Sequence, residues 1–178
     1  MYLIIHVGTE EMELKVSITQ KGKIFEGQAP EIVNKAMTLA MYEATSFLER
    51  EVKKRTPQGV GGAKGGLMST IYGEVIGPGM PLVKGIVAHQ SKYGDVIEKG
   101  RTAGKAMPPE GVLIRWIQVK MGLSEPEAKR VEFVIRRKIG QKGFPGAHMF
   151  EKGLMENWTK LQEIFDRCGF EIARELNV

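Results

Sequence analysis

The strongest constraint on the fold is a row of apolar residues near the carboxyl end of the chain. The row recurs at steps of three or four positions, the spacing that brings side chains to one face of an α-helix. Its members are Phe150, Leu154, Trp158, Leu161, Phe165, Cys168, Ile172 and Leu176. Such a stripe must be covered, so the spacing predicts a long amphipathic helix over residues 147–176. Its cover is either the chain's own sheet and first helix, the usual arrangement in a globular domain, or another subunit.

A second long helix is predicted over residues 30–56. Pro30 suits a first helical position, and the three basic residues 53–55 complement the helix dipole at the other end. Thr56 precedes Pro57, and a residue before proline is pushed out of the helical conformation, so the helix stops there. The predicted apolar face comprises Val33, Ala36, Ala40, Ala44, Phe47 and Val52.

Four shorter segments have the pattern of strands. Residues 12–19 alternate apolar and polar side chains, which is typical of a half-buried strand, and residues 2–7 can precede it in a hairpin. Residues 69–76 and 82–89 are two further strand candidates, and the "GPGMP" between them has turn chemistry. A helical turn is expected after Tyr93, followed by an irregular loop.

Two helices are predicted between that loop and the last helix. Gly122 suits the end of the first, and Ser124 and Glu127 have the spacing of a capping box at the start of the second. Trp116 and Trp158 both lie in apolar helical patterns, so both are expected in the core. The apolar stripe of the second helix comprises Ala128, Val131, Ile135 and Ile139.

These elements predict an α+β fold in one domain over residues 1–178. A small, mainly antiparallel sheet packs against the long first helix and the long C-terminal helix, and a helix pair is inserted between them. The predicted parts are N-terminal strands (1–28), the first helix (30–56), a glycine-rich loop (57–66), strands and loop (67–110), the helix pair (111–143) and the last helix (147–176).

Composition excludes several classes of protein. A hydrophobic fraction of 42% and a charged fraction of 26% are ordinary for a globular protein. The single cysteine excludes a disulfide scaffold. No stretch approaches the roughly 20 apolar residues that a membrane span needs. The first residues lack the basic segment and long apolar run of a signal peptide, so synthesis in the cytosol is expected.

The net charge of +5 is unevenly distributed. Residues 1–52 hold five basic and eight acidic side chains, residues 53–150 hold 17 and seven, and residues 151–178 hold four and six. A basic middle between acidic ends can face nucleic acid, or it can dock on the acidic part of a neighbouring subunit.

The glycine-rich stretch "PQGVGGAKGG" invites comparison with a phosphate-binding loop. Such a loop needs Lys followed by Ser or Thr, between a strand and a helix. In this chain Gly65 follows Lys64, so the magnesium ligand is missing, and the loop leaves a helix to enter a strand candidate. A second near-match, "GRTAGKA", also lacks the Ser or Thr. We therefore expect a conformationally free, basic loop that can reach a neighbour, and no bound nucleotide.

No catalytic or metal-binding constellation is expected. His6, His89 and His148 are far apart, and one cysteine cannot make a structural zinc site. Cys168 falls on the apolar stripe of the last helix, where a small buried hydrophobe is its simpler role. Asp95 and Glu98 can share a helical face, but with several basic residues nearby they are more simply a solvated charged turn. No cofactor is expected.

A basic cluster, "KRVEFVIRRKIGQK", covers most of the second helix of the pair. Arg130 and Arg137 lie seven positions apart and therefore share a face. Such a ridge can contact phosphates without reading sequence, although no DNA-binding signature surrounds it. Non-specific nucleic-acid binding by residues 129–142 is the alternative function.

The order of several short motifs resembles the tail-completion, or minor tail, protein family of long-tailed bacteriophages. In that family a helix ends in a basic stretch and proline, a glycine turn leads to a short apolar motif, and an acidic segment after a tyrosine and a proline–phenylalanine helix follow. The matching motifs are "LEREVKKRTP", "GGLMSTI" (65–71), "YGDVIEKGR" (93–101), "MPP" (107–109) and "GFPGAHMFEKGL" (143–154). This chain departs from the family in its longer glycine loop and its inserted helix pair.

The resemblance implies a structural virion protein of the tail or neck, made in the host cytoplasm. Such proteins join or complete the tail as subunits of a ring, with a hexamer favoured by the resemblance, and they contact other tail and neck proteins. DNA can pass through the ring. The family pattern contains no catalytic residue, so no enzyme is expected. The candidate interface or DNA-facing residues are Lys53, Lys54, Arg55, Lys64, Arg101, Lys105, Arg130 and Arg137.

Overall fold

The computed structural model describes residues 2–7, 12–17, 29–59 and 66–176. Contacts within the chain divide it into two compact units, and each is described by itself. Unit 1 comprises Met1–Arg55, Ile71–His89 and Met149–Val178, and unit 2 comprises Thr56–Thr70 and Gln90–His148. The single domain predicted from the sequence stays a prediction, which depends on whether the two units unfold together.

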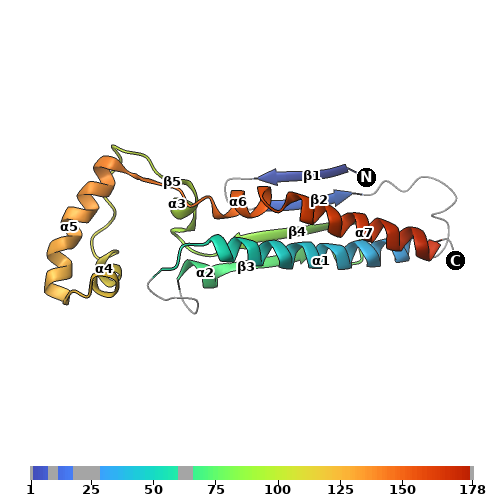
Figure 1. Cartoon of the computed structure of the whole chain (residues 1–178), viewed down its shortest axis with the longest axis horizontal. Helices are drawn as coiled ribbons and strands as arrows, with labels where there is room; N and C mark the ends of the chain where they lie inside the picture. Colours follow the sequence, from blue (N-terminus) through green and yellow to red (C-terminus); the bar gives the residue numbers. More distant parts are fainter. Residues whose placement is uncertain (1, 8–11, 18–28, 60–65, 177–178) are drawn as a thin grey trace. The chain divides into compact units, whose positions relative to one another are not determined.

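Unit 1 contains a four-stranded antiparallel sheet in the order β1-β2-β4-β3 (Figure 1). The strands are β1 (Tyr2–Val7), β2 (Met12–Ser17), β3 (Ile71–Ile76) and β4 (Leu82–His89). The predicted hairpin of the first two strands is confirmed, with Tyr2 opposite Ser17. The third strand begins later than predicted, because a helical turn, α2 (Leu67–Thr70), occupies the start of that segment. Thr70 Oγ1 donates back to the carbonyl oxygen of Leu67, 2.7 Å away, within this turn.

Helix α1 (Ala29–Arg55) lies against β3 and β4, and its predicted bounds hold to within one residue. The approach is close because two strand residues are glycines. A Cβ atom added at Gly85 would lie 2.2 Å from Thr45 Oγ1 and 2.9 Å from Met41 Sδ. One added at Gly73 would lie 2.9 Å from Glu49 Oε2. The glycines therefore set how deeply α1 packs into the sheet.

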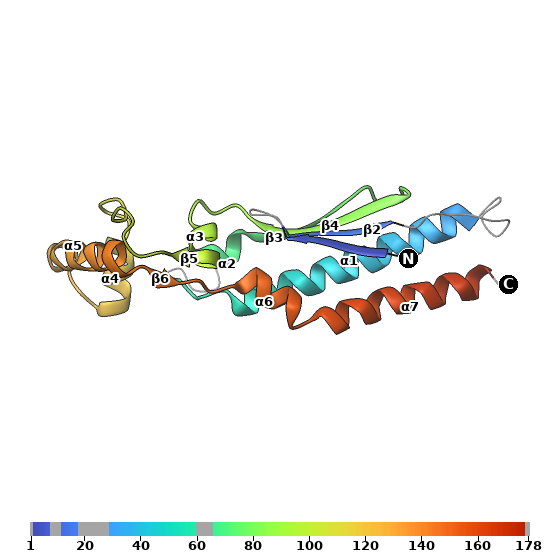
Figure 2. The same cartoon turned by 90° about the horizontal axis from the view of Figure 1, so that it is seen from above.

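The last predicted helix is wrong in one respect, because it is two helices. Helix α6 (Met149–Met155) and helix α7 (Trp158–Leu176) are separated by a turn at Glu156 and Asn157. Asn157 Nδ2 donates to the carbonyl oxygen of Gly153, 2.9 Å away. Both helices pack on α1, on the side facing away from the strands (Figure 2). The chain itself covers the stripe, with Leu154, Leu161, Phe165 and Cys168 buried and the other four members half-buried.

Unit 2 contains helix α3 (Gly94–Lys99) and the predicted helix pair, α4 (Ile114–Met121) and α5 (Glu125–Lys142). Gly122 ends α4 in the left-handed conformation, with its N–H bonded to the carbonyl of Gln118. Ser124 and Glu127 form the predicted capping box at the start of α5. The three local stop and start signals between residues 122 and 127 were therefore sufficient to place the helix boundary.

A short two-stranded ribbon borders the helix pair in the sequence. Strand β5 (Gly100–Arg101) pairs antiparallel with β6 (Phe144–Pro145). At Gly143, where φ is +65°, an added Cβ would lie 1.9 Å from the carbonyl oxygen of Arg101, so only glycine fits. We call residues 97–101 and 143–148 the glycine clip, since backbone bonds from Ala147 to Ile97 (2.8 Å) and from His148 to Glu98 (3.0 Å) also join them.

The predicted fold class is confirmed. The fold is α+β, with long helices α1 and α7 packed with antiparallel sheets and the α4–α5 pair inserted between α1 and α7 in the sequence. No helix in the described ranges is long and apolar enough to span a membrane.

Candidate interaction surfaces

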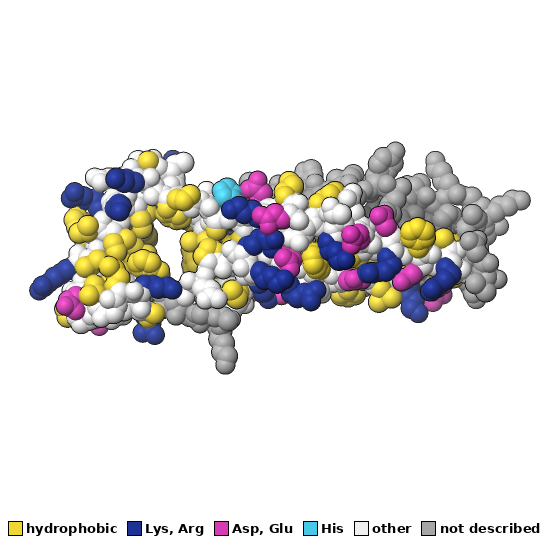
Figure 3. Space-filling model, viewed as in Figure 1, with side chains coloured by type: hydrophobic (Ala, Val, Ile, Leu, Met, Phe, Trp, Pro, Cys, Tyr) yellow, Lys and Arg dark blue, Asp and Glu magenta, His cyan; other side chains and the backbone are white. Residues whose placement is uncertain are grey.

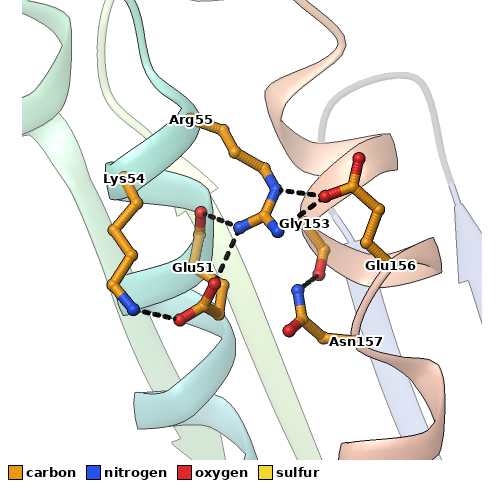
Figure 4. Close-up of polar contacts among 6 residues, drawn as sticks. All are labelled: Glu51, Lys54, Arg55, Gly153, Glu156 and Asn157. Atoms are coloured by element: carbon orange, nitrogen blue, oxygen red, sulfur yellow. Dashed lines mark hydrogen bonds and ion pairs between the residues drawn. The ribbon is translucent and has the colours of Figure 1, made fainter.

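The basic end of α1 is neutralised within unit 1. Lys53 pairs with Glu49, and Lys54 pairs with Glu51. Arg55 binds on two sides: its Nη1 lies 2.8 Å from Glu51 Oε2, and its Nε and Nη2 donate to Glu156 Oε2 at 2.9 and 2.7 Å (Figure 4). Three predicted interface residues are therefore engaged with carboxylates of their own chain.

This cluster joins the last turn of α1 to the turn between α6 and α7. Hydrogen bonds from Lys54 and then Arg55 lower the pKa of the Glu51 carboxyl below its usual range. Hydrogen bonds to Glu51 and then Glu156 raise the pKa of the Arg55 guanidinium. The Arg55 side chain is 23% exposed. The cluster can therefore fix the position of the turn between α6 and α7 on α1. Most of its charges are already paired within the chain.

Arg101 and Lys105, two of the predicted interface residues, both lie in unit 2 but differ in exposure. Lys64, a third, lies outside the described residues. Arg101 is half-buried in β5, and its Nη2 donates to the carbonyl oxygen of Ala106. Its Nε is buried and has no hydrogen-bond partner in the part of the chain that the structure describes. Lys105 is exposed in the following loop. The Arg101 side chain therefore binds the backbone of the loop that follows β5, whereas the Lys105 side chain is exposed to solvent.

Arg130 and Arg137 are exposed on α5, as the seven-residue spacing requires. Among the described residues, no carboxylate forms an ion pair with either. Between them lie two exposed apolar side chains, Phe133 (52% exposed) and Val134. Arg136, by contrast, points its Nε at the carbonyl oxygen of Pro108, 2.7 Å away. The outward face of α5 is therefore both basic and apolar.

Helix α4 has an outward face of the same kind. Trp116 was predicted in the core, and this prediction is wrong: the side chain is 40% exposed, because α4 buries the opposite face around Ile117. Val119 and Met121 are exposed as well. Arg115 and Lys120 accompany them.

Each of these two helices therefore exposes both basic and apolar side chains. On α4 they are Arg115, Trp116, Val119 and Lys120, and on α5 they are Arg130, Phe133, Val134 and Arg137. Figure 3 shows hydrophobic side chains over α4 and α5 with Lys and Arg around them. Unit 2 carries 13 Lys and Arg against six Asp and Glu, whereas unit 1 carries 13 against 15. The basic excess of the chain therefore belongs to unit 2.

A buried carboxylate holds the two helices together. Glu132 of α5 is 2% exposed and accepts hydrogen bonds from the backbone N–H groups of Gly111 (3.1 Å) and Leu113 (3.0 Å), just before α4 begins. A negative charge at a helix N-terminus is also favoured by the helix dipole. The sequence signal for this residue is an acidic side chain four positions after Ala128, on the buried side of α5.

Unit 1 also exposes apolar side chains. Phe170 on α7 is 78% exposed, the largest fraction among the exposed large hydrophobic residues described. A shallow hollow of about 540 Å³ lies elsewhere on the unit, beside α1, where Thr38 Oγ1 accepts a hydrogen bond from the Gly79 N–H at 2.8 Å. It is lined by Glu31, Asn34, Lys35, Thr38, Leu39 and Gly79. These groups form no recognisable catalytic arrangement.

The cysteine is buried in unit 1. Burial, and to a smaller extent Glu171, raises the pKa of the Cys168 thiol to about 11, so a reactive thiolate is disfavoured. Cys168 Sγ lies 3.8 Å from Met37 Sδ in the core, as its position in the stripe predicts. The ring of His89 lies 5.8 Å from that of Phe150. Within the described ranges, no group of three His, Cys, Asp or Glu side chains is placed to hold a metal ion.

The chain was compared with models of protein families, with curated proteins and with solved structures, and it matches none of them.

Proposed function

We propose that this chain is a structural virion protein of a long-tailed bacteriophage, which completes the tail or joins it to the head. The observation that carries the proposal is the order of the five sequence motifs between residues 48 and 154. The proposed protein acts by assembling into a ring, with a hexamer favoured, and by docking on other tail and neck proteins. It is made in the host cytoplasm and resides in the tail or neck of the virion.

The distribution of apolar side chains supports an assembly role. Of the 21 buried hydrophobic residues described, 18 belong to unit 1 and three, Leu67, Ile117 and Ala128, belong to unit 2. Unit 2 instead exposes Trp116 and Phe133 beside arginines, and aromatic residues and arginine are enriched at protein interfaces. A unit with few buried side chains and exposed anchors gains its apolar burial on contact with a partner.

The self-assembly part of the proposal is tested with the purified full chain. Sedimentation velocity over a wide range of concentrations should give a monomer that converts into one closed species, and electron microscopy should show rings. Immunodetection in purified phage particles tests the virion part. A chain that stays monomeric at the highest concentration and is absent from particles would refute the proposal.

The second candidate function is non-specific nucleic-acid binding. It is favoured by Arg130 and Arg137, which are exposed, share a face of α5 and pair with no described carboxylate. It predicts binding of duplex DNA that weakens steeply with salt, because each phosphate contact releases counterions. The double variant Arg130→Glu, Arg137→Glu should then lose binding, while Lys152→Glu in unit 1 should retain it. Binding that is insensitive to the double variant excludes this role for α5.

A further inference from the structure

We infer that the exposed face of α5 binds single-stranded nucleic acid, with one base stacked on Phe133 and the neighbouring phosphates on Arg130 and Arg137. The inference rests on the second candidate function and deepens it, because it names the strand state of the ligand and adds an aromatic contact. It concerns α5 alone, so it leaves the proposed protein contacts of Trp116 on α4 unchanged. We call Arg130, Phe133 and Arg137 the α5 stripe.

The three side chains of the α5 stripe are neighbours on one face of the helix. Phe133 follows Arg130 by three positions and precedes Arg137 by four, and at these spacings the Cβ atoms of a helix lie about 5–6 Å apart. The two arginines are therefore two turns apart, about 10 Å along the axis, with the ring between them. A cation on each side of an aromatic ring is thus a property of this single helix.

Phe133 is exposed although α5 has an apolar side that it partly buries. Val131 and Ile135 are half-buried on that side, together with the buried Ala128. Phe133, the largest apolar side chain of α5, is 52% exposed on the other side. Among the described residues, no other aromatic ring contacts it. The ring is therefore accessible to a planar ligand.

The charges beside the ring are positive. Arg130 and Arg137 are exposed, and neither forms an ion pair with a described carboxylate. Glu127, three positions before Arg130, is instead held by Ser124 in the capping box. Arg136 differs from both, because its side chain is only 14% exposed and already binds the backbone of the preceding loop. Phosphate groups complement the charge of the two exposed arginines.

A single strand fits this face better than a duplex does. In a duplex each base is covered by its neighbours in the stack, so only the arginines would contact it. In a single strand the base faces are accessible, and proteins hold such strands by combining cations with aromatic side chains on which the bases stack. A membrane surface is disfavoured, because Phe133 and Val134 make a narrow apolar face whereas interfacial helices carry a broad one.

The first experiment separates the ring from the charges by fluorescence anisotropy with the full chain. The probes are a labelled oligodeoxythymidylate and the same strand annealed to oligodeoxyadenylate. Phe133→Ala should weaken binding of the single strand about 5- to 100-fold and leave duplex binding unchanged, because only an unpaired base reaches the ring. Phe133→Leu retains an apolar side chain without the ring and should behave like Phe133→Ala. The control Phe170→Ala removes an exposed ring of α7 and should bind both probes like the wild type.

The salt dependence of binding tests the two arginines. On a single strand, the slope of log K against log salt concentration is about −0.7 for each phosphate that the protein neutralises. Arg130→Gln and Arg137→Gln should each reduce the size of this slope by about 0.7, while Lys152→Gln in unit 1 should not. Phe133→Ala should weaken binding at every salt concentration with the slope unchanged, since the ring carries no charge.

A labelled oligouridylate distinguishes RNA from DNA as the strand that is bound. Its 2′-hydroxyl groups are the difference from a deoxy strand. Tighter binding of either strand identifies the nucleic acid, and both results support the inference if Phe133→Ala weakens that binding.

The outcomes separate this inference from the second candidate function. Single-strand binding that survives Phe133→Ala or Phe133→Leu, or duplex binding that is weakened equally, overturns the stacking and leaves phosphate binding by α5 standing. If Phe133→Ala weakens self-association and not oligonucleotide binding, the face belongs to a protein contact and the inference is equally overturned. A wild-type chain that binds neither probe removes both. Circular dichroism of each variant verifies that the helices are intact.

Discussion

Unit 1 and unit 2 are built by the same chain on different principles. In unit 1, a sheet and three helices enclose an apolar core, and the basic end of α1 is balanced by Glu49, Glu51 and Glu156. In unit 2, a capping box, a buried carboxylate and a glycine clip hold the elements together, and among the described residues of the unit three hydrophobic side chains are buried. Apolar burial fixes unit 1, whereas specific polar and backbone contacts fix unit 2. Unit 2 also leaves the aromatic side chains of Trp116 and Phe133 exposed.

The largest effects are expected when a buried side chain is truncated in each unit in turn, which tests whether the two units differ in how they are stabilised. Leu161→Ala in α7 and Ile117→Ala in α4 each truncate a fully buried side chain, and each should cost about 2–5 kcal/mol where it acts. We expect Leu161→Ala to lower the free energy of global unfolding and Ile117→Ala to open the helix pair locally. Hydrogen exchange of the backbone amides distinguishes the two.

The contrary result is informative about domain organisation. If Ile117→Ala reduces amide protection in α1 and β4 as much as in α4 and α5, the chain unfolds as the one domain that the sequence predicts. The two units would then form one cooperative unit of unfolding.

The next effect concerns the polar contact in unit 2. Glu132→Ala leaves the N–H groups of Gly111 and Leu113 without their acceptor, and hydrogen bonds to a charged group are worth about 1.5–3 kcal/mol. We expect faster amide exchange at those two positions and weaker helical circular dichroism. Glu125→Ala removes an exposed carboxylate of the same helix and should leave both unchanged. Equal effects of the two substitutions would contradict a special role for Glu132.

A third test probes the close approach in unit 1. Gly85→Ala inserts a methyl group against Thr45 and Met41, and overpacking of this kind costs about 1–3 kcal/mol. Gly169→Ala in α7 meets nothing within 4 Å and should instead stabilise the helix by about 0.5–1 kcal/mol. Urea denaturation measures both. A neutral Gly85→Ala would show that α1 can shift on the sheet.

The smallest predicted effect is a dependence on pH. The pKa of Glu51 is lowered in the folded chain, so its contribution is present above the unfolded pKa and is lost as the pH falls through the folded one. Exposed ion pairs contribute about 1 kcal/mol or less. We expect that in Glu51→Gln the free energy of unfolding of unit 1 falls less steeply as the pH is lowered. Urea denaturation at a series of pH values measures this slope. Glu127, whose pKa is lowered by hydrogen bonds from Ser124, provides the parallel test in unit 2.

Local signals in the sequence predicted much of the fold. The proline, glycine and capping residues at positions 57, 122, 124 and 127 act over one turn of chain, so they placed helix boundaries without knowledge of the tertiary structure. The break between α6 and α7 was missed; Glu156, in the turn between them, binds Arg55, which is distant in the sequence. The predicted apolar face of α1 was confirmed at Val33, Ala40, Ala44 and Val52, which are buried. It was too narrow, because Met37, Met41 and Leu48 are buried as well, while Ala36 and Phe47 are half-buried. Helix α1 packs against strands on one side and helices on another, so its buried arc is wider than one stripe.

The candidate surfaces were only partly predictable. The exposure of Arg130 and Arg137 followed from their spacing. The pairs of Lys53 with Glu49 and of Lys54 and Arg55 with Glu51 have the three- and four-residue spacing of one helix face and could have been predicted, whereas Glu156 is brought to Arg55 only by folding. Trp116 was assigned to the core because helical periodicity shows that a face is apolar and does not show whether anything covers it. Periodicity alone therefore does not distinguish an exposed aromatic residue from a buried one.

The glycine clip has a consequence for how such a chain can change. Because β5 and β6 bring Arg101 and Phe144 side by side in one ladder, residues 102–143 enter and leave through neighbouring points. A tight Asn-Gly turn could join those two points directly. We therefore expect that residues 102–143 can be replaced by such a turn while the strands and long helices of unit 1 keep their fold.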